Sequence, residues 1–113
     1  MKKWLTLTLF LLCNLLYSQR SGKATFYHDK YENRTTASGD RFKQAKLTAA
    51  SNIYKMGSIL KVTNKDNDKS VIVRVNDTGA FRMPTIVDLS KSAFKSIGDL
   101  RRGWLNVIVE VIE

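Results

Sequence analysis

Cysteine is nearly absent from this chain of 113 residues. Cys13 is the single cysteine, and His28 and Pro84 are likewise the single histidine and the single proline. Cys13 lies in an N-terminal apolar run, so the rest of the chain must fold without disulfide bonds. One histidine also leaves too few ligands for a transition-metal site, and we expect no metal and no other cofactor. The sequence has no internal repeat and no Pro-rich linker, which favours one compact domain.

The N-terminus has the pattern of a secretory signal peptide. Two lysines precede an apolar run from Trp4 to Tyr17. This run is shorter than the roughly 20 residues of a membrane-spanning helix. We therefore expect residues 1–18 to be cleaved as a signal peptide, and residues 19–113 to act in the periplasm or outside the cell without stable membrane insertion. Lipid anchoring is not expected, because Cys13 follows a leucine and not a small residue.

Basic side chains outnumber acidic ones, and the formal net charge is +9. The basic residues are scattered along the chain and form no block. Outside the cytoplasm this balance favours anionic polymers such as cell-wall material over nucleic acid. The alternative is an ordinary solvated basic surface. Nothing in the pattern indicates an oligomer, and we expect a monomer.

Short runs of β-branched and aromatic residues predict a mainly β fold. In one run Val71, Val73 and Val75 alternate with other residues, so one face points into a core. Turn-forming residues at Asn64–Asp68 predict a hairpin around them. So many short strands in a small chain favour a closed barrel over an open sheet. The expected strands are 23–28, 58–63, 70–76, 85–89 and 104–112, with a further candidate at 46–50.

One short helix is expected after Ser90. Ser90 can cap the start, and Ala93, Phe94 and Ile97 fall on one side at helical spacing. Gly98 is expected to end the helix in the left-handed conformation.

The sequence Asp77-Thr78-Gly79 after apolar residues is how retroviral-type aspartic proteases present their catalytic acid. Those enzymes need two carboxylates that share one proton, each following an apolar strand. Here a polar residue, Asn76, precedes the acid, and the later Ser96–Gly98 lacks an acid. The sequence therefore argues against an aspartic protease.

The chain contains the sequence blocks GKATFY, TTASGDRF, LTAAS, VRVNDTGAF and IVDLSKSAF. Their order and spacing resemble the rare lipoprotein A (RlpA) family from about Gly22 to Glu113. That resemblance implies a six-stranded double-psi β-barrel related to expansins, with one short helix after Ser90. It also implies a lytic transglycosylase that cuts peptidoglycan glycan strands to leave 1,6-anhydro ends and prefers strands stripped of stem peptides.

The resemblance places candidate catalytic acids at Asp40, Asp77 and Asp88. Asp40 matches the general acid, which is usually a glutamate, and Asp77 matches a second catalytic carboxylate. Asp88 matches the acid that expansin-like barrels keep in their groove. Glycosidic cleavage needs a proton on the leaving oxygen, and neighbouring carboxylates can keep one acid protonated. Structural roles are also open: a turn residue at 40, a backbone-bonding turn at 77 and a helix-dipole contact at 88.

Candidate substrate contacts flank these acids. Ser51 stands where the family has a histidine, and Thr78 stands where it has an arginine. Tyr27 and Phe81 can stack on sugar rings, and Arg82 can meet carboxylates of the polymer. The two replacements keep a second hypothesis open, a non-catalytic expansin-like module that binds peptidoglycan or loosens the wall. A third hypothesis, suggested by charge alone, is a partner-binding domain of the cell envelope.

Overall fold

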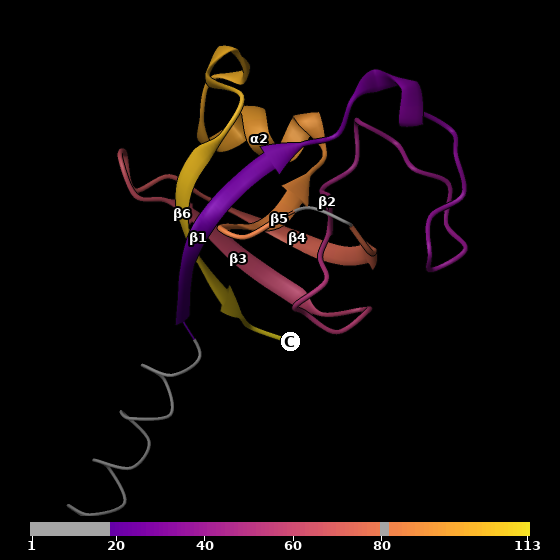
Figure 1. Cartoon of the computed structure of the whole chain (residues 1–113), viewed down its shortest axis with the longest axis horizontal. Helices are drawn as coiled ribbons and strands as arrows, with labels where there is room; N and C mark the ends of the chain where they lie inside the picture. Colours follow the sequence, from indigo (N-terminus) through magenta and orange to yellow (C-terminus); the bar gives the residue numbers. More distant parts are fainter. Residues whose placement is uncertain (1–18, 80–81) are drawn as a thin grey trace, which may run out of the picture.

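The computed structural model describes residues 19–79 and 82–113, which form a closed six-stranded barrel with one α-helix. The expected signal peptide, including Cys13, lies outside the described residues. The barrel strands and the helix α2 are seen in Figure 1. Their bounds are β1 Gln19–Phe26, β2 Thr48–Ala50, β3 Ile59–Asn64, β4 Ser70–Asp77, β5 Thr85–Leu89, α2 Lys91–Ile97 and β6 Leu105–Val111, with short 3-10 turns η1 Asp29–Tyr31 and η2 Leu100–Arg102.

The strands follow the spatial order β1-β5-β2-β4-β3-β6 and close on themselves. Two of the pairings, β1 with β5 and β2 with β4, are parallel, and the others are antiparallel. The expected hairpin is confirmed as β3 and β4, with Val62 opposite Val71. Closure of the barrel pairs the backbone N–H and C=O groups of strand edges that would otherwise be exposed. The mainly β barrel predicted from the residue pattern is therefore confirmed.

Two strands carry a bulge. Along β4 the register against β2 passes from Val75 directly to Asp77, which leaves Asn76 without a ladder partner. Along β5 the register against β1 passes from Thr85 to Val87 and skips Ile86. A bulge changes the direction in which the following side chains point. The bulge at Asn76 directly precedes Asp77, and the bulge at Ile86 lies two residues before Asp88, so the bulges set the direction of those acids.

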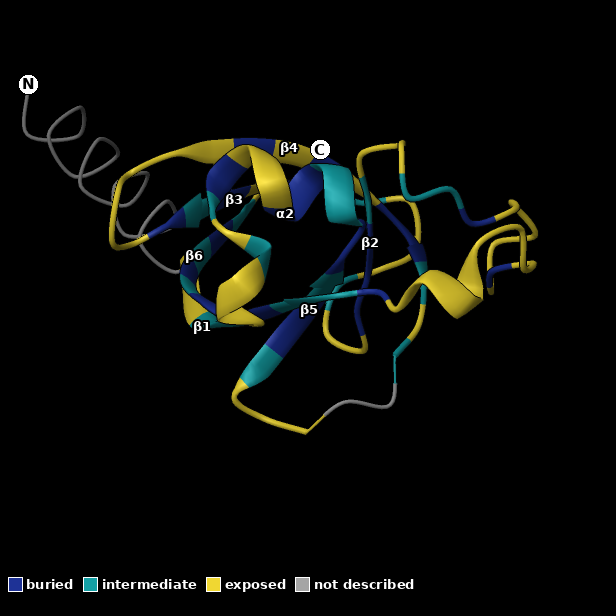
Figure 2. Cartoon of the chain, turned by 90° about the horizontal axis from the view of Figure 1, so that it is seen from above, coloured by how far each residue is buried: buried dark blue, intermediate teal, exposed yellow. Residues whose placement is uncertain are grey.

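Apolar side chains from all six strands and α2 fill the barrel, and in Figure 2 the buried residues lie mostly on the strands and α2 and the exposed ones mostly on the loops around them. Val71, Val73 and Val75 are buried as the alternation predicts. The first strand begins at Gln19 and not at the expected Lys23, because its N-terminal half pairs with β6. The long segment between β1 and β2 extends to one side of the barrel (Figure 1).

The expected helix is confirmed, but its predicted ending is wrong. Ser90 accepts a hydrogen bond from the Ala93 N–H, and Ala93, Phe94 and Ile97 are buried. Gly98 has φ −167° and ψ −176°, which is extended backbone and not left-handed. A Cβ atom there would lie 2.7 Å from Leu105 Cδ1, so glycine is needed for close packing of the chain against β6.

None of the helices in the described ranges is both long and apolar enough to cross a membrane.

Candidate active site

Two of the three candidate acids lie on neighbouring parts of one groove at the end of the barrel. In the strand registers Ala50 of β2 pairs with Asp77 of β4 on one side and with Asp88 of β5 on the other. Because Asp77 and Asp88 are separated by two strand spacings, their Cα atoms lie roughly 10 Å apart. Both acids line a cavity of about 200 Å³, which we call the acidic groove, together with Tyr27, Tyr31, Ala50, Thr78 and Gly79.

Asp77 is held by hydrogen bonds from three directions. The Tyr27 hydroxyl donates to its Oδ2 at 2.7 Å, and the backbone N–H groups of Ala37 and Thr78 donate to its Oδ1 at 2.9 Å each. Both oxygens of the Asp77 side chain accept hydrogen bonds, so these three donors fix its orientation. Gly79 N–H bonds Asn52 and not Asp77, so the backbone-bonding turn considered for Asp77 is not formed towards Gly79.

Asp88 has a different environment. Its side chain is partly buried in the floor of the groove, where the Thr25 hydroxyl donates to Oδ1 at 3.2 Å. Burial raises the pKa of Asp88 from 3.8 to about 6, the Thr25 hydrogen bond opposes this rise, and the charge of Asp77 adds to it. Asp77 is thus surrounded by hydrogen-bond donors, whereas Asp88 retains its proton to a higher pH. Acid catalysis by a pair of carboxyl groups requires such a difference between them.

An aromatic cluster supports the groove beside Asp77. Tyr27 is 6% exposed and stacks on Phe42 at 4.0 Å between ring centroids, with Tyr31 edge-on at 5.9 Å. Burial, followed by the hydrogen bond to Asp77, raises the pKa of Tyr27. Tyr27 is thus a buried partner of Asp77 and not the open stacking surface expected from the sequence. The exposed ring at this place is Tyr31, which lines both the acidic groove and an adjoining cavity of about 240 Å³.

Asp40 lies on the other side of the loop that holds Asp77. This loop is bonded to β4 through Ser38 N–H to the Asn76 carbonyl, at 3.1 Å. Gly39 turns the loop with φ 94°, and the exposed Asp40 side chain lines a separate cavity. The structure therefore brings Asp77 and Asp88 together and leaves Asp40 outside their groove.

Ser51, which stands at the position of the family histidine, is 2% exposed. Its hydroxyl donates to the Ile86 carbonyl at 2.9 Å and accepts from the Ile53 and Tyr54 N–H groups. Ile86 is the bulged residue of β5, so Ser51 satisfies a carbonyl that the bulge leaves without a ladder partner. The hydroxyl is fully used in holding this bulge and does not face the groove.

The other expected substrate contacts differ in position. Thr78 is exposed and lines the acidic groove. Arg82 is exposed just before β5, and it does not line the groove or its adjoining cavity. Phe81 lies outside the described residues. The single histidine, His28, accepts a hydrogen bond from Lys30 N–H at the start of η1, a local structural role at the strand end.

Three functional contacts were missed by the sequence reasoning. Ala50 forms the floor between the two acids, and its small side chain leaves that floor open. Ala37 and Thr25 each contribute one donor to an acid. Ala37 acts through its backbone and Thr25 through a strand pairing, so neither has a local sequence signal.

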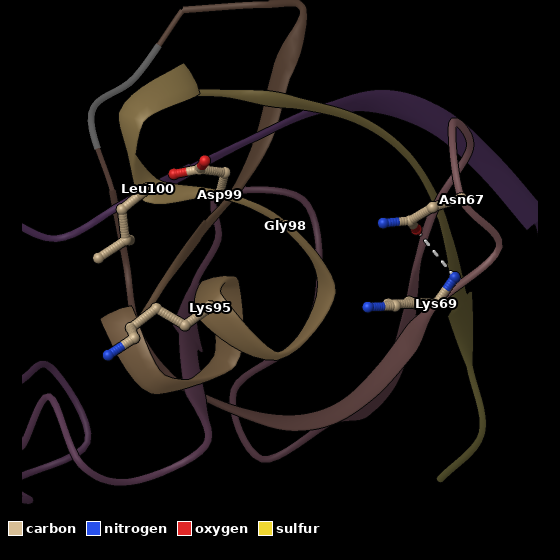
Figure 3. A pocket seen from close by; sticks show the side chains of 6 residues that line it. All are labelled: Asn67, Lys69, Lys95, Gly98, Asp99 and Leu100. Carbon is tan, nitrogen blue, oxygen red and sulfur yellow. Dashed lines mark hydrogen bonds between the residues drawn. The ribbon is translucent and has the colours of Figure 1, made fainter.

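A larger cavity, of about 490 Å³, lies between the β3–β4 turn and the segment after α2 (Figure 3). Two of its polar side chains, Asn67 and Asp99, are bonded within the protein. Asn67 accepts from Lys69 N–H and donates to the Ile97 carbonyl, and Asp99 is bonded to Arg101. This cavity lacks a pair of acids and is not the candidate active site.

Two proteins of known name are similar to this chain in sequence. The sequence is 44% identical over 92 residues to an endolytic peptidoglycan transglycosylase RlpA of Vibrio cholerae, which covers 81% of this chain and 35% of the relative. A protein of the same name from Haemophilus influenzae is 41% identical over 93 residues, covering 82% of this chain and 32% of the relative. The chain thus spans about a third of the length of these relatives.

Solved structures share the fold at low sequence identity. A Streptomyces papain inhibitor superposes with a TM-score of 0.70 at 22% identity, covering 84% of this chain and 94% of the inhibitor. An expansin variant of Clavibacter michiganensis in complex with cellohexaose has a TM-score of 0.67 at 20% identity and covers 84% of this chain and 50% of the expansin. These likenesses support the double-psi β-barrel expected from the sequence.

The family model described as lytic transglycolase matches residues 19–109, which is most of the chain and includes every strand that frames the groove. The chain therefore belongs to the lytic transglycolase family of double-psi β-barrel domains.

Proposed function

We propose that this chain is an exported cell-envelope protein that cleaves peptidoglycan glycan strands as a lytic transglycosylase. Residues 1–18 serve as its signal peptide, and residues 19–113 form the RlpA-like catalytic domain. The observation that carries the proposal is the pair of acids around Ala50, in which Asp77 accepts three hydrogen bonds while burial raises the pKa of Asp88 to about 6. The family match and the names of the relatives support the same substrate.

The chemistry starts from a glycan strand lying in the acidic groove. Protonated Asp88 donates its proton to the glycosidic oxygen, and the bond from that oxygen to the anomeric carbon breaks. The carboxylate of Asp77 stabilises the positive charge that develops on the sugar. The C6 hydroxyl of the same sugar then bonds to the anomeric carbon and returns its proton to Asp88. The product carries a 1,6-anhydro end, and Asp88 is protonated again.

The family resemblance assigns the proton donor to Asp40, whereas the geometry favours Asp88. Asp40 is exposed and outside the groove, and Asp88 is the partly buried acid beside a second carboxylate. Asp40 lies on the loop whose Ala37 N–H donates to Asp77, and this loop helps to hold the Asp77 side chain in place. We therefore propose Asp88 as proton donor and Asp77 as the assisting carboxylate.

The test uses denuded glycan strands incubated with the purified protein, followed by mass spectrometry. We expect 1,6-anhydro ends from the native protein, and their loss in both Asp77→Asn and Asp88→Asn. A matched control is Asp66→Asn, because Asp66 is an acid in the distant β3–β4 turn. Intact strands with a folded native protein would contradict an enzymatic role.

The second candidate is a non-catalytic module that binds peptidoglycan. The observation that favours it is Ser51, because its buried hydroxyl occupies the position of a family histidine and cannot take part in proton transfer. This candidate predicts that the protein sediments with wall sacculi without releasing fragments, and that the Asp88→Asn protein sediments equally well.

A further inference from the structure

A second cavity, with the opposite charge, is lined by Asn76, the residue that precedes Asp77 on β4. We call it the basic cavity; it has a volume of about 320 Å³, and the proposed chemistry does not use it. The long segment before β2, β2 itself and the outer side of β4 contribute its walls. The lining residues are Asp40, Arg41, Lys43, Lys46, Thr48, Arg74 and Asn76.

Asn76 is the bulged residue of β4, and it is 5% exposed. Its side-chain Oδ1 is buried and has no hydrogen-bond partner among the described residues; the same is true of Thr48 Oγ1 from the adjacent strand. A buried polar atom without a hydrogen-bond partner destabilises the folded protein. An amide oxygen needs a donor and a hydroxyl can serve either role, so a ligand that fills this cavity must bring at least one O–H or N–H group.

The net positive charge of the residues that line the basic cavity favours an anionic ligand. Four of its lining residues are cations and one is an acid. Lys43 and Arg41 donate to Asn33, whereas neither Lys46 nor Arg74 has a side-chain partner in the described part of the chain. A bare anion satisfies the cations but offers no donor to Asn76. A sugar that carries both a carboxylate and a hydroxyl or amide N–H group provides a partner for the cations and for the Asn76 Oδ1 atom.

The basic cavity and the acidic groove are lined by neighbouring residues of β4. Asn76 lines one and Asp77 lines the other, and these residues are consecutive on β4. One polymer strand can therefore contact both.

From these contacts we propose that the basic cavity is a subsite for a sugar acid of the glycan strand, with Lys46 and Arg74 binding its carboxylate and Asn76 accepting from its hydroxyl or amide N–H. The polymer is identified through the proposed function. In peptidoglycan the matching unit is N-acetylmuramic acid, whose lactyl carboxylate is ionised where no stem peptide is attached.

The test is a titration of the isotopically labelled protein, followed through the NMR signals of Asn76 and Thr48. The probes are N-acetylmuramic acid, N-acetylglucosamine, which lacks the carboxylate, and N-acetylmuramoyl-L-alanyl-D-isoglutamine, in which the lactyl carboxyl is blocked. We expect saturable shifts at both residues with the first probe and at least tenfold weaker binding of the other two. These monosaccharide probes contain no bond for a glycosidase to cut, so the result is independent of whether the protein is an enzyme.

Variants separate a specific site from general attraction to a basic protein. Replacing both cations, Lys46→Gln with Arg74→Gln, is expected to weaken binding of N-acetylmuramic acid by more than about tenfold, since both charged hydrogen bonds to its carboxylate are lost. The matched control is Lys61→Gln, an exposed cation on β3, which is expected to leave binding within twofold. Equal binding of N-acetylglucosamine or of the blocked probe would overturn the proposal, as would no shift at Asn76 or an unchanged affinity in the double variant.

Discussion

At the scale of single residues, the account depends on the different environments of two aspartates. Asp77 and Asp88 have the same side chain, but one is surrounded by donors and the other is partly buried with a single hydroxyl partner. Desolvation disfavours the charged form of Asp88, whereas the three donors fix the position of the Asp77 side chain. The sequence identified both acids, but their roles follow from neighbours such as Thr25 and Tyr27.

The raised pKa of Asp88 has a consequence for stability. A carboxyl whose pKa is higher in the folded state than in the unfolded state destabilises the fold as pH rises from about 4 to about 6. The rise from 3.8 to about 6 corresponds to a cost of up to about 3 kcal/mol at neutral pH. Asp88→Asn removes this cost and keeps an acceptor for the Thr25 hydroxyl.

We therefore expect Asp88→Asn to increase the free energy of unfolding at pH 7.5 by about 1–3 kcal/mol and to change it little at pH 3.5. Urea unfolding of both proteins across this pH range measures the difference. A difference that does not depend on pH would mean that the Asp88 carboxyl has no raised pKa.

Tyr27 offers a second test at this scale. Its hydroxyl donates to Asp77 at 2.7 Å, so Tyr27→Phe removes one hydrogen bond to a charged group while keeping the ring on Phe42. We expect a loss of about 1.5–3 kcal/mol in the free energy of unfolding. In a double-mutant cycle with Asp77→Asn, the two losses are expected to be non-additive by at least about 0.5 kcal/mol. Additive losses would show that the contact contributes nothing.

At the scale of secondary-structure elements, alternation and turn residues predicted the β3–β4 hairpin and the helix after Ser90. The bulges at Asn76 and Ile86 had no such signal, because a bulge is defined by the partner strand. The family resemblance suggested Ser51 as a substrate contact, whereas its hydroxyl bonds the Ile86 carbonyl. Local pattern thus located the elements, and strand pairing decided where their polar side chains lie.

Gly98 illustrates this limit and allows a direct test. Its backbone is extended, so Ala is permitted by conformation, yet the added Cβ would lie 2.7 Å from Leu105 Cδ1. We expect Gly98→Ala to destabilise the fold by about 1–3 kcal/mol through overpacking. In the background of Leu105→Ala, which removes the contacting atoms, the same change is expected to cost much less. Thermal unfolding of the four proteins measures both costs, and an equal cost in both backgrounds would place the strain elsewhere.

At the scale of the whole molecule, the double-psi barrel brings β2, β4 and β5 side by side although they are distant in sequence. The strands β4 and β5 therefore place Asp77 and Asp88 on either side of Ala50. The resemblance of the sequence blocks predicted this fold. It also grouped Asp40 with the other acids, whereas the 36–40 loop presents Asp40 to a different cavity because its backbone is bonded to the end of β4.

The dependence of glycan cleavage on pH tests the central claim most directly. If Asp88 donates the proton, the rate of formation of 1,6-anhydro ends falls as pH rises through about 6, approaching a tenfold loss per pH unit. Folded Asp88→Asn is expected to be inactive throughout, while Asp40→Asn keeps the pH profile of the native protein. A native rate that stays constant from pH 5 to pH 8, or cleavage by Asp88→Asn at the native rate, would contradict the account.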